Sequence, residues 1–119
     1  MKMYLEKVKE IAENLNWNVS IDENYVNFQT YSSAEQDFNM IIPYDENDTV
    51  WEFIENIYSY YDEFDVSYEA YLWLDESGHG TNGAPYEMID VYKDMEECKE
   101  EIHRLWYELN NYDWDSEEV

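Results

Sequence analysis

The sequence predicts one α+β domain: an N-terminal helix, a three-stranded antiparallel β-sheet, and then two to three helices packed on one face of the sheet. Apolar residues recur at helical spacing near the N-terminus and again after residue 48, whereas between these regions they alternate with polar residues. The 119 residues suffice for one core but are few for two, and 45% of them are hydrophobic. We therefore treat residues 1–119 as a single domain.

The first half is expected to contain one helix and three strands. Residues 4–15 favour an amphipathic helix, because apolar side chains recur there every three or four positions. From residue 17 the period becomes two, which is typical of half-buried strands. Polar turns at 22–24 and 32–35 separate strands at 17–21, 25–31 and 38–42. Consecutive strands with short turns form an antiparallel meander.

The second half is expected to be helical. Asn47 or Asp48 is a suitable N-cap for the next helix. Its inward side chains are expected to be Val50, Ile54, Ile57, Tyr61 and Phe64. Asp65 then restarts a shorter helix that extends to Leu74.

A loop and a long helix complete the expected fold. All three glycines fall within residues 76–85, which predicts one long loop. The apolar spacing after Pro85 predicts a long amphipathic helix. Residues 110–119 form an acidic tail that is expected to fray.

The charge of the chain is strongly one-signed. The net charge is −24, and between Glu10 and Tyr92 nineteen acidic residues occur without a single lysine or arginine. Like charge excludes ordinary binding to nucleic acids and to anionic membranes. Adaptation to high salt would also produce an acidic surface, but it does not explain why the few basic residues are concentrated near the two ends. The simplest interpretation is a surface suited to a basic protein partner.

The candidate partner-binding residues are acidic side chains at helical spacing. Residues three or four apart share a helix face, and such like-charged neighbours lack the usual basic partners here. The first set is Asp48, Glu52, Glu55 and Asp62, and the second is Asp90, Asp94, Glu97, Glu101 and Glu108, interrupted by Arg104. A solvated helix face is the ordinary alternative for either set alone.

Tyrosines accompany these carboxylates. The chain has thirteen, and several cluster around the middle helices: Tyr58, Tyr60, Tyr61, Tyr68 and Tyr71. A tyrosine beside a carboxylate offers an incoming arginine both a stacking face and a salt-bridge partner. We include Tyr58 and Tyr60 among the partner-binding residues.

No catalytic or metal-binding pattern is convincing, so we expect a protein that is not an enzyme and binds no cofactor or metal. His79 in the glycine-rich loop and His103 in the last helix are expected to be incidental polar residues. Cys98 and His103 are five positions apart, which does not place them on one helical face for a zinc site. The N-terminus lacks the apolar segment of a signal peptide, so a cytoplasmic location is expected.

In its order of elements and its charge, the chain resembles the small acidic DNA-mimic proteins of phages and mobile genetic elements. These include anti-restriction proteins and type II anti-CRISPR proteins. The resemblance covers residues 5–15, 17–42 and 48–109, and no sequence motif supports it. It implies an inhibitor that occupies the site where arginines and lysines of a nuclease hold DNA, including the PAM-reading arginines of Cas9.

The functional hypothesis is therefore a non-enzymatic DNA mimic that inhibits a bacterial defence nuclease inside the host cell. Within this hypothesis an anti-CRISPR protein acting on a Cas nuclease is favoured over an anti-restriction protein. The alternative is an acidic adaptor or antidote protein that binds a basic protein without imitating DNA. A small enzyme or metal-binding protein centred on the His79 loop is the remaining possibility.

Overall fold

The structure, a computed structural model, describes residues 3–81 and 84–116 and has the expected α+β architecture. The elements follow the order helix, three strands, three helices and a short 3-10 helix. Their bounds are α1 Met3–Asn14, β1 Asn18–Ile21, β2 Tyr25–Tyr31, β3 Asp37–Pro43, α2 Val50–Glu63, α3 Val66–Tyr71, α4 Met88–Asn111 and η1 Trp114–Ser116. The predicted fold class is thus confirmed.

The three strands form an antiparallel sheet in the order β1-β2-β3. Val26 pairs with Ile42 and Phe28 with Met40, so these side chains point from adjacent strands to the same face. All four are buried. The opposite face carries polar side chains together with the exposed Tyr25, Tyr31 and Ile41. On it Asn18 donates to Gln29 at 2.8 Å, and Gln29 donates to Asp37 at 2.7 Å. One face therefore meets the core, and the other meets water.

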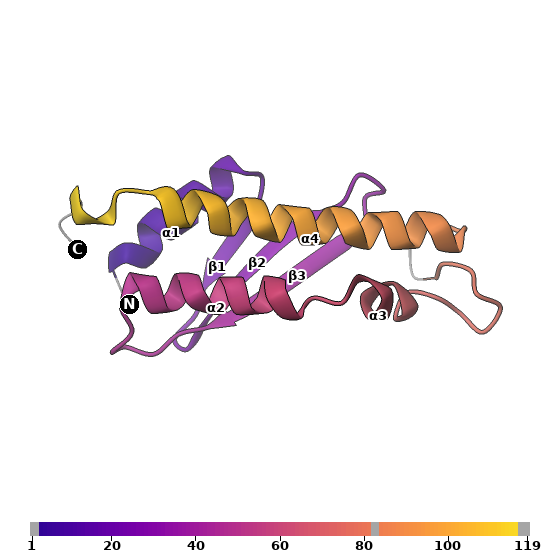
Figure 1. Ribbon diagram of the computed structural model, residues 1–119, viewed down its shortest axis with the longest axis horizontal. Coiled ribbons are helices and arrows are strands. Elements are labelled where there is room, and N and C mark those ends of the chain that lie inside the picture. The colour runs from indigo at the N-terminus through magenta and orange to yellow at the C-terminus, as the bar shows by residue number, and fades with distance from the viewer. Residues whose placement is uncertain (1–2, 82–83, 117–119) are drawn as a thin grey trace.

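α1, α2 and α4 lie over the apolar face of the sheet, and α3 lies beyond its end (Figure 1). α2 and α3 follow one another along one side of α4, and both pack against it. α1 lies beside β1 and also contacts α4. The molecule is elongated, with extents of 53 × 23 × 21 Å. The outer surface between α2 and α4 therefore forms a long face parallel to the longest axis.

The helix starts differ in one detail from the sequence prediction. Thr49, rather than Asn47 or Asp48, is the N-cap of α2. Its side chain accepts from the backbone N–H of Glu52 while the Glu52 carboxylate accepts from the backbone N–H of Thr49, forming a capping box. Asp65 caps α3 as predicted, but that helix ends at Tyr71 and not at Leu74.

The C-terminal segment is ordered further than predicted. α4 continues to Asn111, and Trp114 folds back with only 4% of its surface exposed. The indole Nε1–H of Trp114 donates to the carbonyl oxygen of Leu109 at 2.8 Å. The prediction that residues 110–119 fray is therefore wrong for 110–116, because the indole is anchored on the last turn of α4. Residues 117–119 lie outside the described part of the chain.

The glycine-rich loop is folded back on itself. Leu74 and Gly80 form an antiparallel bridge, and the N–H of Gly80 donates to the carbonyl of Tyr86 at 2.9 Å. A Cβ atom at position 80 would lie 1.7 Å from the carbonyl oxygen of Pro85. Only glycine permits this close approach of two backbone segments.

We predict that Gly80→Ala destabilises the protein by about 1–3 kcal/mol, because the added methyl group must displace backbone rather than a flexible side chain. Urea denaturation would measure the change. Ser59→Ala, on the exposed side of α2, is the control and should alter stability by about 0.5 kcal/mol or less. Equal midpoints for Gly80→Ala and the parent protein would contradict this account of the loop.

Candidate partner-binding surface

Two of the four acidic residues predicted around α2, Asp48 and Glu52, already accept hydrogen bonds from the backbone. The Oδ2 atom of Asp48 accepts from the backbone N–H of Asp45 at 2.8 Å. The Oε1 atom of Glu52 accepts from the backbone N–H of Thr49 at 3.3 Å. Asp48 thus closes the 45–48 turn that precedes α2, and Glu52 completes the capping box of α2, so engaging a partner would cost these bonds. Sequence spacing alone did not distinguish a capping acid from a free one.

The other two, Glu55 and Asp62, are exposed and have no hydrogen bond or ion pair within the described part of the chain. Glu55 lies one turn after Trp51 and one turn before Tyr58, and Asp62 lies one turn after Tyr58. Residues at these spacings are neighbours on a helix. Exposed aromatic and carboxylate side chains therefore alternate along this face of α2.

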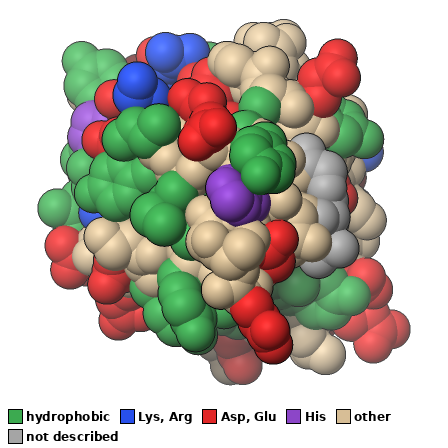
Figure 2. All heavy atoms as spheres, turned by 90° about the vertical axis from the view of Figure 1, so that its right-hand side faces the viewer, with side chains coloured by type: hydrophobic (Ala, Val, Ile, Leu, Met, Phe, Trp, Pro, Cys, Tyr) green, Lys and Arg blue, Asp and Glu red, His purple; other side chains and the backbone are tan. Residues whose placement is uncertain are grey.

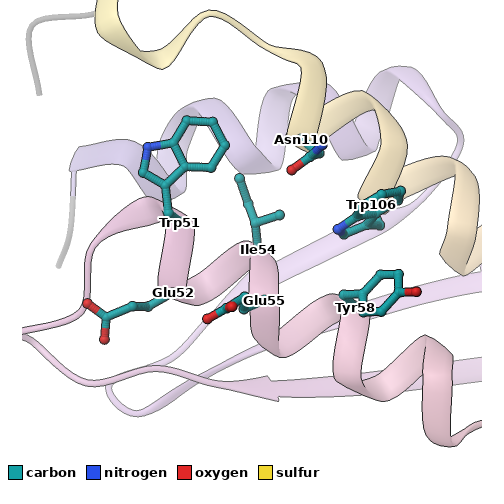
Figure 3. A pocket seen from close by; sticks show the side chains of 7 residues that line it. All are labelled: Trp51, Glu52, Ile54, Glu55, Tyr58, Trp106 and Asn110. Carbon is teal, nitrogen blue, oxygen red and sulfur yellow. The ribbon is translucent and has the colours of Figure 1, made fainter.

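Between α2 and α4 lies a hollow of about 530 Å³, which we call the aromatic groove. It is lined by Trp51, Glu52, Ile54, Glu55, Tyr58, Trp106 and Asn110. Figure 3 shows Ile54 near its middle, Trp51 toward one end, and Tyr58 and Trp106 toward the other. The Tyr58 and Trp106 ring centroids are 5.0 Å apart. Trp51 remains 46% exposed and Tyr58 41%, so both present aromatic surface to solvent.

The aromatic contacts continue along α4 into a second, smaller hollow. The His103 ring lies between Trp106 and Tyr61, with centroids 5.5 and 5.0 Å away. The Lys99 ammonium lies over the Tyr61 ring, 5.1 Å from its centroid, and donates to the carbonyl of Phe64 at 2.9 Å. The lining of this second hollow, of about 260 Å³, thus already includes a cation of the chain itself.

Tyr60, predicted to contact a partner, turns toward the core. It is half-buried and packs against Phe64, with ring centroids 6.3 Å apart. Burial is the largest cause of the raised pKa of its hydroxyl, and the nearby Glu69 carboxylate adds to it. A phenol in this position contributes to packing between α2 and its neighbours and offers a partner little surface.

The acidic residues selected on α4 include one that is buried, which corrects its assignment to the partner surface. Asp94 is 5% exposed, and its Oδ2 accepts from the hydroxyl of Ser32 at 2.7 Å. Gln36 is also buried. Oriented to satisfy its neighbours, its amide nitrogen donates to Asp94 at 2.7 Å and its oxygen accepts from Trp73 Nε1 at 3.0 Å. Asp94 thus links α4 to the β2–β3 turn and the segment after α3.

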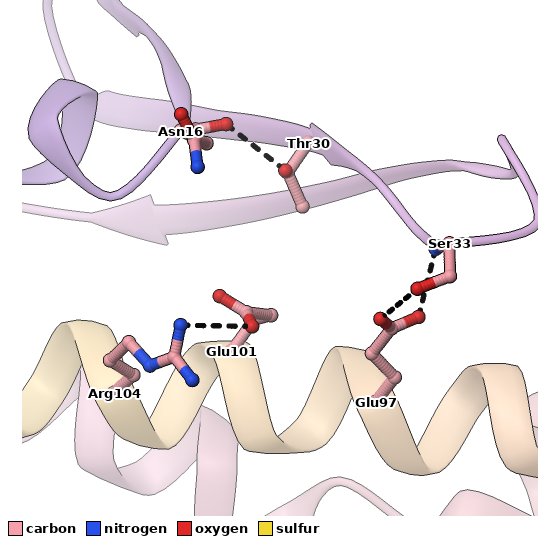
Figure 4. A network of polar contacts seen from close by, with 6 residues as sticks. All are labelled: Asn16, Thr30, Ser33, Glu97, Glu101 and Arg104. Atoms are coloured by element: carbon pink, nitrogen blue, oxygen red, sulfur yellow. Dashed lines mark hydrogen bonds and ion pairs between the residues drawn. The ribbon is translucent and has the colours of Figure 1, made fainter.

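The same side of α4 carries two further engaged carboxylates, of which Glu97 binds the β2–β3 turn and Glu101 pairs within α4 (Figure 4). Glu97 accepts from the backbone N–H of Ser33 at 2.9 Å and from the hydroxyl of the same residue. Glu101 pairs with Arg104 at 3.4 Å. Asp90 is exposed, and its side chain has no partner among the described residues. Of the predicted shared face, Asp94 and Glu97 thus bind the β2–β3 turn, whereas Asp90 and Glu108 remain exposed.

Burial changes the acidity of two groups on this side of α4. Desolvation raises the pKa of Asp94, with hydrogen bonds from Ser32 and the Ala34 backbone opposing the shift. Desolvation, reinforced by Asp94 and other carboxylates, raises the pKa of the Cys98 thiol to about 12. Cys98 is therefore a protonated core side chain at neutral pH and is unsuited to act as a nucleophile or metal ligand.

In the glycine-rich loop, Asp75, Ser77 and His79 form hydrogen bonds to one another. Asp75 Oδ1 accepts from the hydroxyl of Ser77 at 2.6 Å and from the backbone N–H of His79 at 3.1 Å. These bonds lower the pKa of Asp75. The His79 ring stacks on Tyr86 with centroids 4.0 Å apart, and its Nδ1 is 2.8 Å from Ser77 Oγ. The Ser77 hydroxyl is directed at the carboxylate, an arrangement that stabilises a turn.

Large apolar side chains are exposed at this end of the molecule. In Figure 2, hydrophobic side chains gather on one side of the end view, with carboxylates around them. Six large apolar side chains in and next to α3 and the start of α4 are each more than half exposed, and we call them the apolar patch: Tyr68, Tyr71, Leu72, Tyr86, Met88 and Ile89. They come from two segments that meet because α3 packs against α4. The sequence showed the aromatic residues here, but only the fold brings the two segments together.

Within residues 3–81 and 84–116, no group of three or more His, Cys, Asp or Glu side chains is arranged to hold a metal ion. None of the helices described is long and apolar enough to cross a membrane. Comparisons with protein-family models, curated proteins and solved structures found no match. The geometry and charge of the surface are therefore the features that bear on function.

We predict that Asp94→Ala destabilises the protein by about 1–3 kcal/mol, since it leaves the buried amide of Gln36 and the partly buried hydroxyl of Ser32 without their acceptor. Asp90→Ala removes the same charge from an exposed site one turn earlier and should change stability by about 0.5 kcal/mol or less. Denaturant midpoints of both variants would test this. Equal effects would show that the Asp94 network is not a structural anchor.

The isolated protein should become more stable when moderate salt is added or when the pH falls below 7. Salt screens the carboxylate repulsion. Desolvation raises the pKa of Asp94 and of Glu69 in the folded state, so the folded chain binds protons before the unfolded chain does. Their protonation stabilises the fold as pH falls through the raised pKa, and this gain levels off below the unfolded-state value of about 4. Thermal melts at several salt concentrations and pH values would measure it. A falling melting temperature under either change would contradict the prediction.

Proposed function

We propose that this protein is a non-enzymatic inhibitor that competes with DNA for the basic nucleic-acid-binding surface of a bacterial defence nuclease, most specifically a Cas nuclease of the host cell. Its partner is a protein rich in arginine and lysine, and neither nucleic acid nor membrane binds it directly. The second target class is a restriction enzyme, which an anti-restriction protein would inhibit by the same competition with DNA.

The observation that carries the proposal is the density of negative charge along an elongated body. The chain has a net charge of −24, and Lys2, Glu117 and Glu118 lie outside the described residues, which leaves −23 for the described part. Along the 53 Å axis this amounts to one net negative charge for every ~2.3 Å, compared with one for every ~1.7 Å of duplex DNA. A surface that holds a duplex is therefore electrostatically complementary to this protein.

Long-range charge and local contacts would contribute differently to such a complex. The unneutralised field accelerates association with a basic surface and makes binding sensitive to salt. The exposed Glu55 and Asp62 supply contacts at fixed positions on α2. Tyr58 lies between them, and Trp51 lies one turn before Glu55. Aromatic residues of this kind dominate the energetics of many interfaces.

The apolar patch favours a second candidate function, an acidic adaptor or antidote that binds a basic protein without displacing DNA. Exposed apolar surface of this kind marks protein interaction sites in monomeric proteins. DNA presents no equivalent surface, so imitation of a duplex leaves the patch unexplained. An adaptor would use the patch together with the surrounding acids.

A competition experiment separates the two functions. We expect the protein to displace labelled target duplex from a Cas nuclease–guide complex at about 50 mM salt, with weaker displacement at about 200 mM because counterion effects weaken charged contacts. A restriction enzyme with its recognition duplex forms the parallel arm. A ternary complex of protein, nuclease and duplex would support the adaptor, and failure to bind or inhibit either enzyme would refute the inhibitor proposal.

Charge reversal locates the contact. Glu55→Lys with Asp62→Lys should weaken inhibition by roughly tenfold or more, because two exposed contacts become repulsive. The control is Glu6→Lys with Glu13→Lys on α1, which changes the net charge equally at exposed positions elsewhere. Equal losses for the two double variants would indicate that only net charge matters, and unchanged potency of the first would exclude this face.

A further inference from the structure

We propose that the aromatic groove is a binding site for the guanidinium group of an arginine side chain presented by the protein partner. The proposal builds on the suggested function, since both require a cationic partner. It adds the specific chemistry recognised and the residues that recognise it.

The first argument is the position of Glu55 between two aromatic side chains. Trp51 precedes it by four residues and Tyr58 follows it by three, so both rings neighbour the carboxylate on the α2 surface. Trp106, from α4, lines the groove at the Tyr58 end, and the centroids of these two rings are 5.0 Å apart. An extended side chain lying in the groove would pass over aromatic faces and end at the carboxylate.

The second argument is that this carboxylate has not been neutralised. The residues lining the groove include no lysine, arginine or histidine. Glu52, the other acid of the lining, is engaged in the capping box, whereas Glu55 has no bonding partner among the described residues. Asn110 adds an amide oxygen on the α4 side, as Figure 3 shows. The free acceptors of the groove are thus matched to a cation.

The third argument comes from the neighbouring hollow, where the chain supplies its own cation. Lys99 places its ammonium over the Tyr61 ring, 5.1 Å from the ring centroid. Glu96 and Glu100 line the same hollow. The two hollows combine aromatic and acidic side chains in the same way. The aromatic groove differs in lacking an internal cation, which leaves its position open for one from outside.

Arginine fits the groove better than lysine. Its planar guanidinium stacks on aromatic faces and binds a carboxylate through two parallel hydrogen bonds, whereas an ammonium is a more strongly hydrated point charge. Other occupants fit poorly: a phosphate or an acidic peptide would meet Glu55, and a second copy of the chain would bring its own large negative charge.

Short blocked peptides provide the test. A peptide with two arginines would be titrated into the intact protein at low salt, in parallel with matched lysine and citrulline peptides. We expect the indole N–H signals of Trp51 and Trp106 to shift in heteronuclear NMR spectra. The arginine peptide should bind about threefold or more tightly than the lysine peptide, and the neutral citrulline peptide should not bind measurably.

Two matched pairs of variants identify the groove. Glu55→Gln should weaken arginine binding about threefold or more, whereas Glu108→Gln removes an equal charge from the other side of α4 and should not. Trp51→Ala should abolish the groove shifts, whereas Tyr107→Ala, at a comparably exposed aromatic residue outside the lining, should not.

Each outcome decides the matter. Equal affinity for arginine and lysine, equal losses in Glu55→Gln and Glu108→Gln, or shifts absent from Trp51 and Trp106 would overturn the arginine site. The peptide result is independent of the DNA competition experiment. Peptide binding without displacement of duplex would retain the arginine site and refute the DNA-mimic proposal. Displacement of duplex without peptide binding would retain the DNA-mimic proposal and refute the arginine site.

Discussion

The structure depends on one long helix, α4, which buries one apolar side in the core while its other sides carry many carboxylates. The apolar side of α4 consists of Val91, Met95, Cys98, Ile102, Leu105 and Leu109, all buried. α1, α2 and α3 each contact this helix. With so few basic residues, surface ion pairs cannot offset the repulsion among its acids. Burial of apolar area must therefore supply the stability, which explains why so many aromatic side chains enter the core.

The fold uses several of its acids as hydrogen-bond acceptors for backbone and hydroxyl groups. Glu52 and Asp65 cap helices, Asp75 organises the glycine-rich loop, and Asp94 and Glu97 attach the β2–β3 turn to α4. An acceptor needs no cation when N–H and O–H donors surround it. Acidity therefore has two consequences here: some carboxylates stabilise local structure, and the remainder, exemplified by Glu55 and Asp62, stay available at the surface.

The aromatic side chains beside the available carboxylates restrict where a cationic group can approach them. A field of negative charge attracts any basic protein and discriminates weakly among them, whereas rings fixed on α2 and α4 define where a cationic side chain can lie flat. The apolar patch at the α3–α4 end adds a second, chemically different surface at one end of the long axis.

The sequence by itself determined the α+β order, the three strands and the long last helix, because hydrophobic periodicity is a local property that survives without knowledge of packing. It also identified Glu55, Asp62 and Tyr58 as surface residues. It could not determine that Asp94 is buried, that Tyr60 turns inward, or that Trp114 anchors the C-terminal segment. Spacing along a helix tells which residues share a face, and only the tertiary arrangement decides what that face meets: solvent, the β2–β3 turn, or the neighbouring helix.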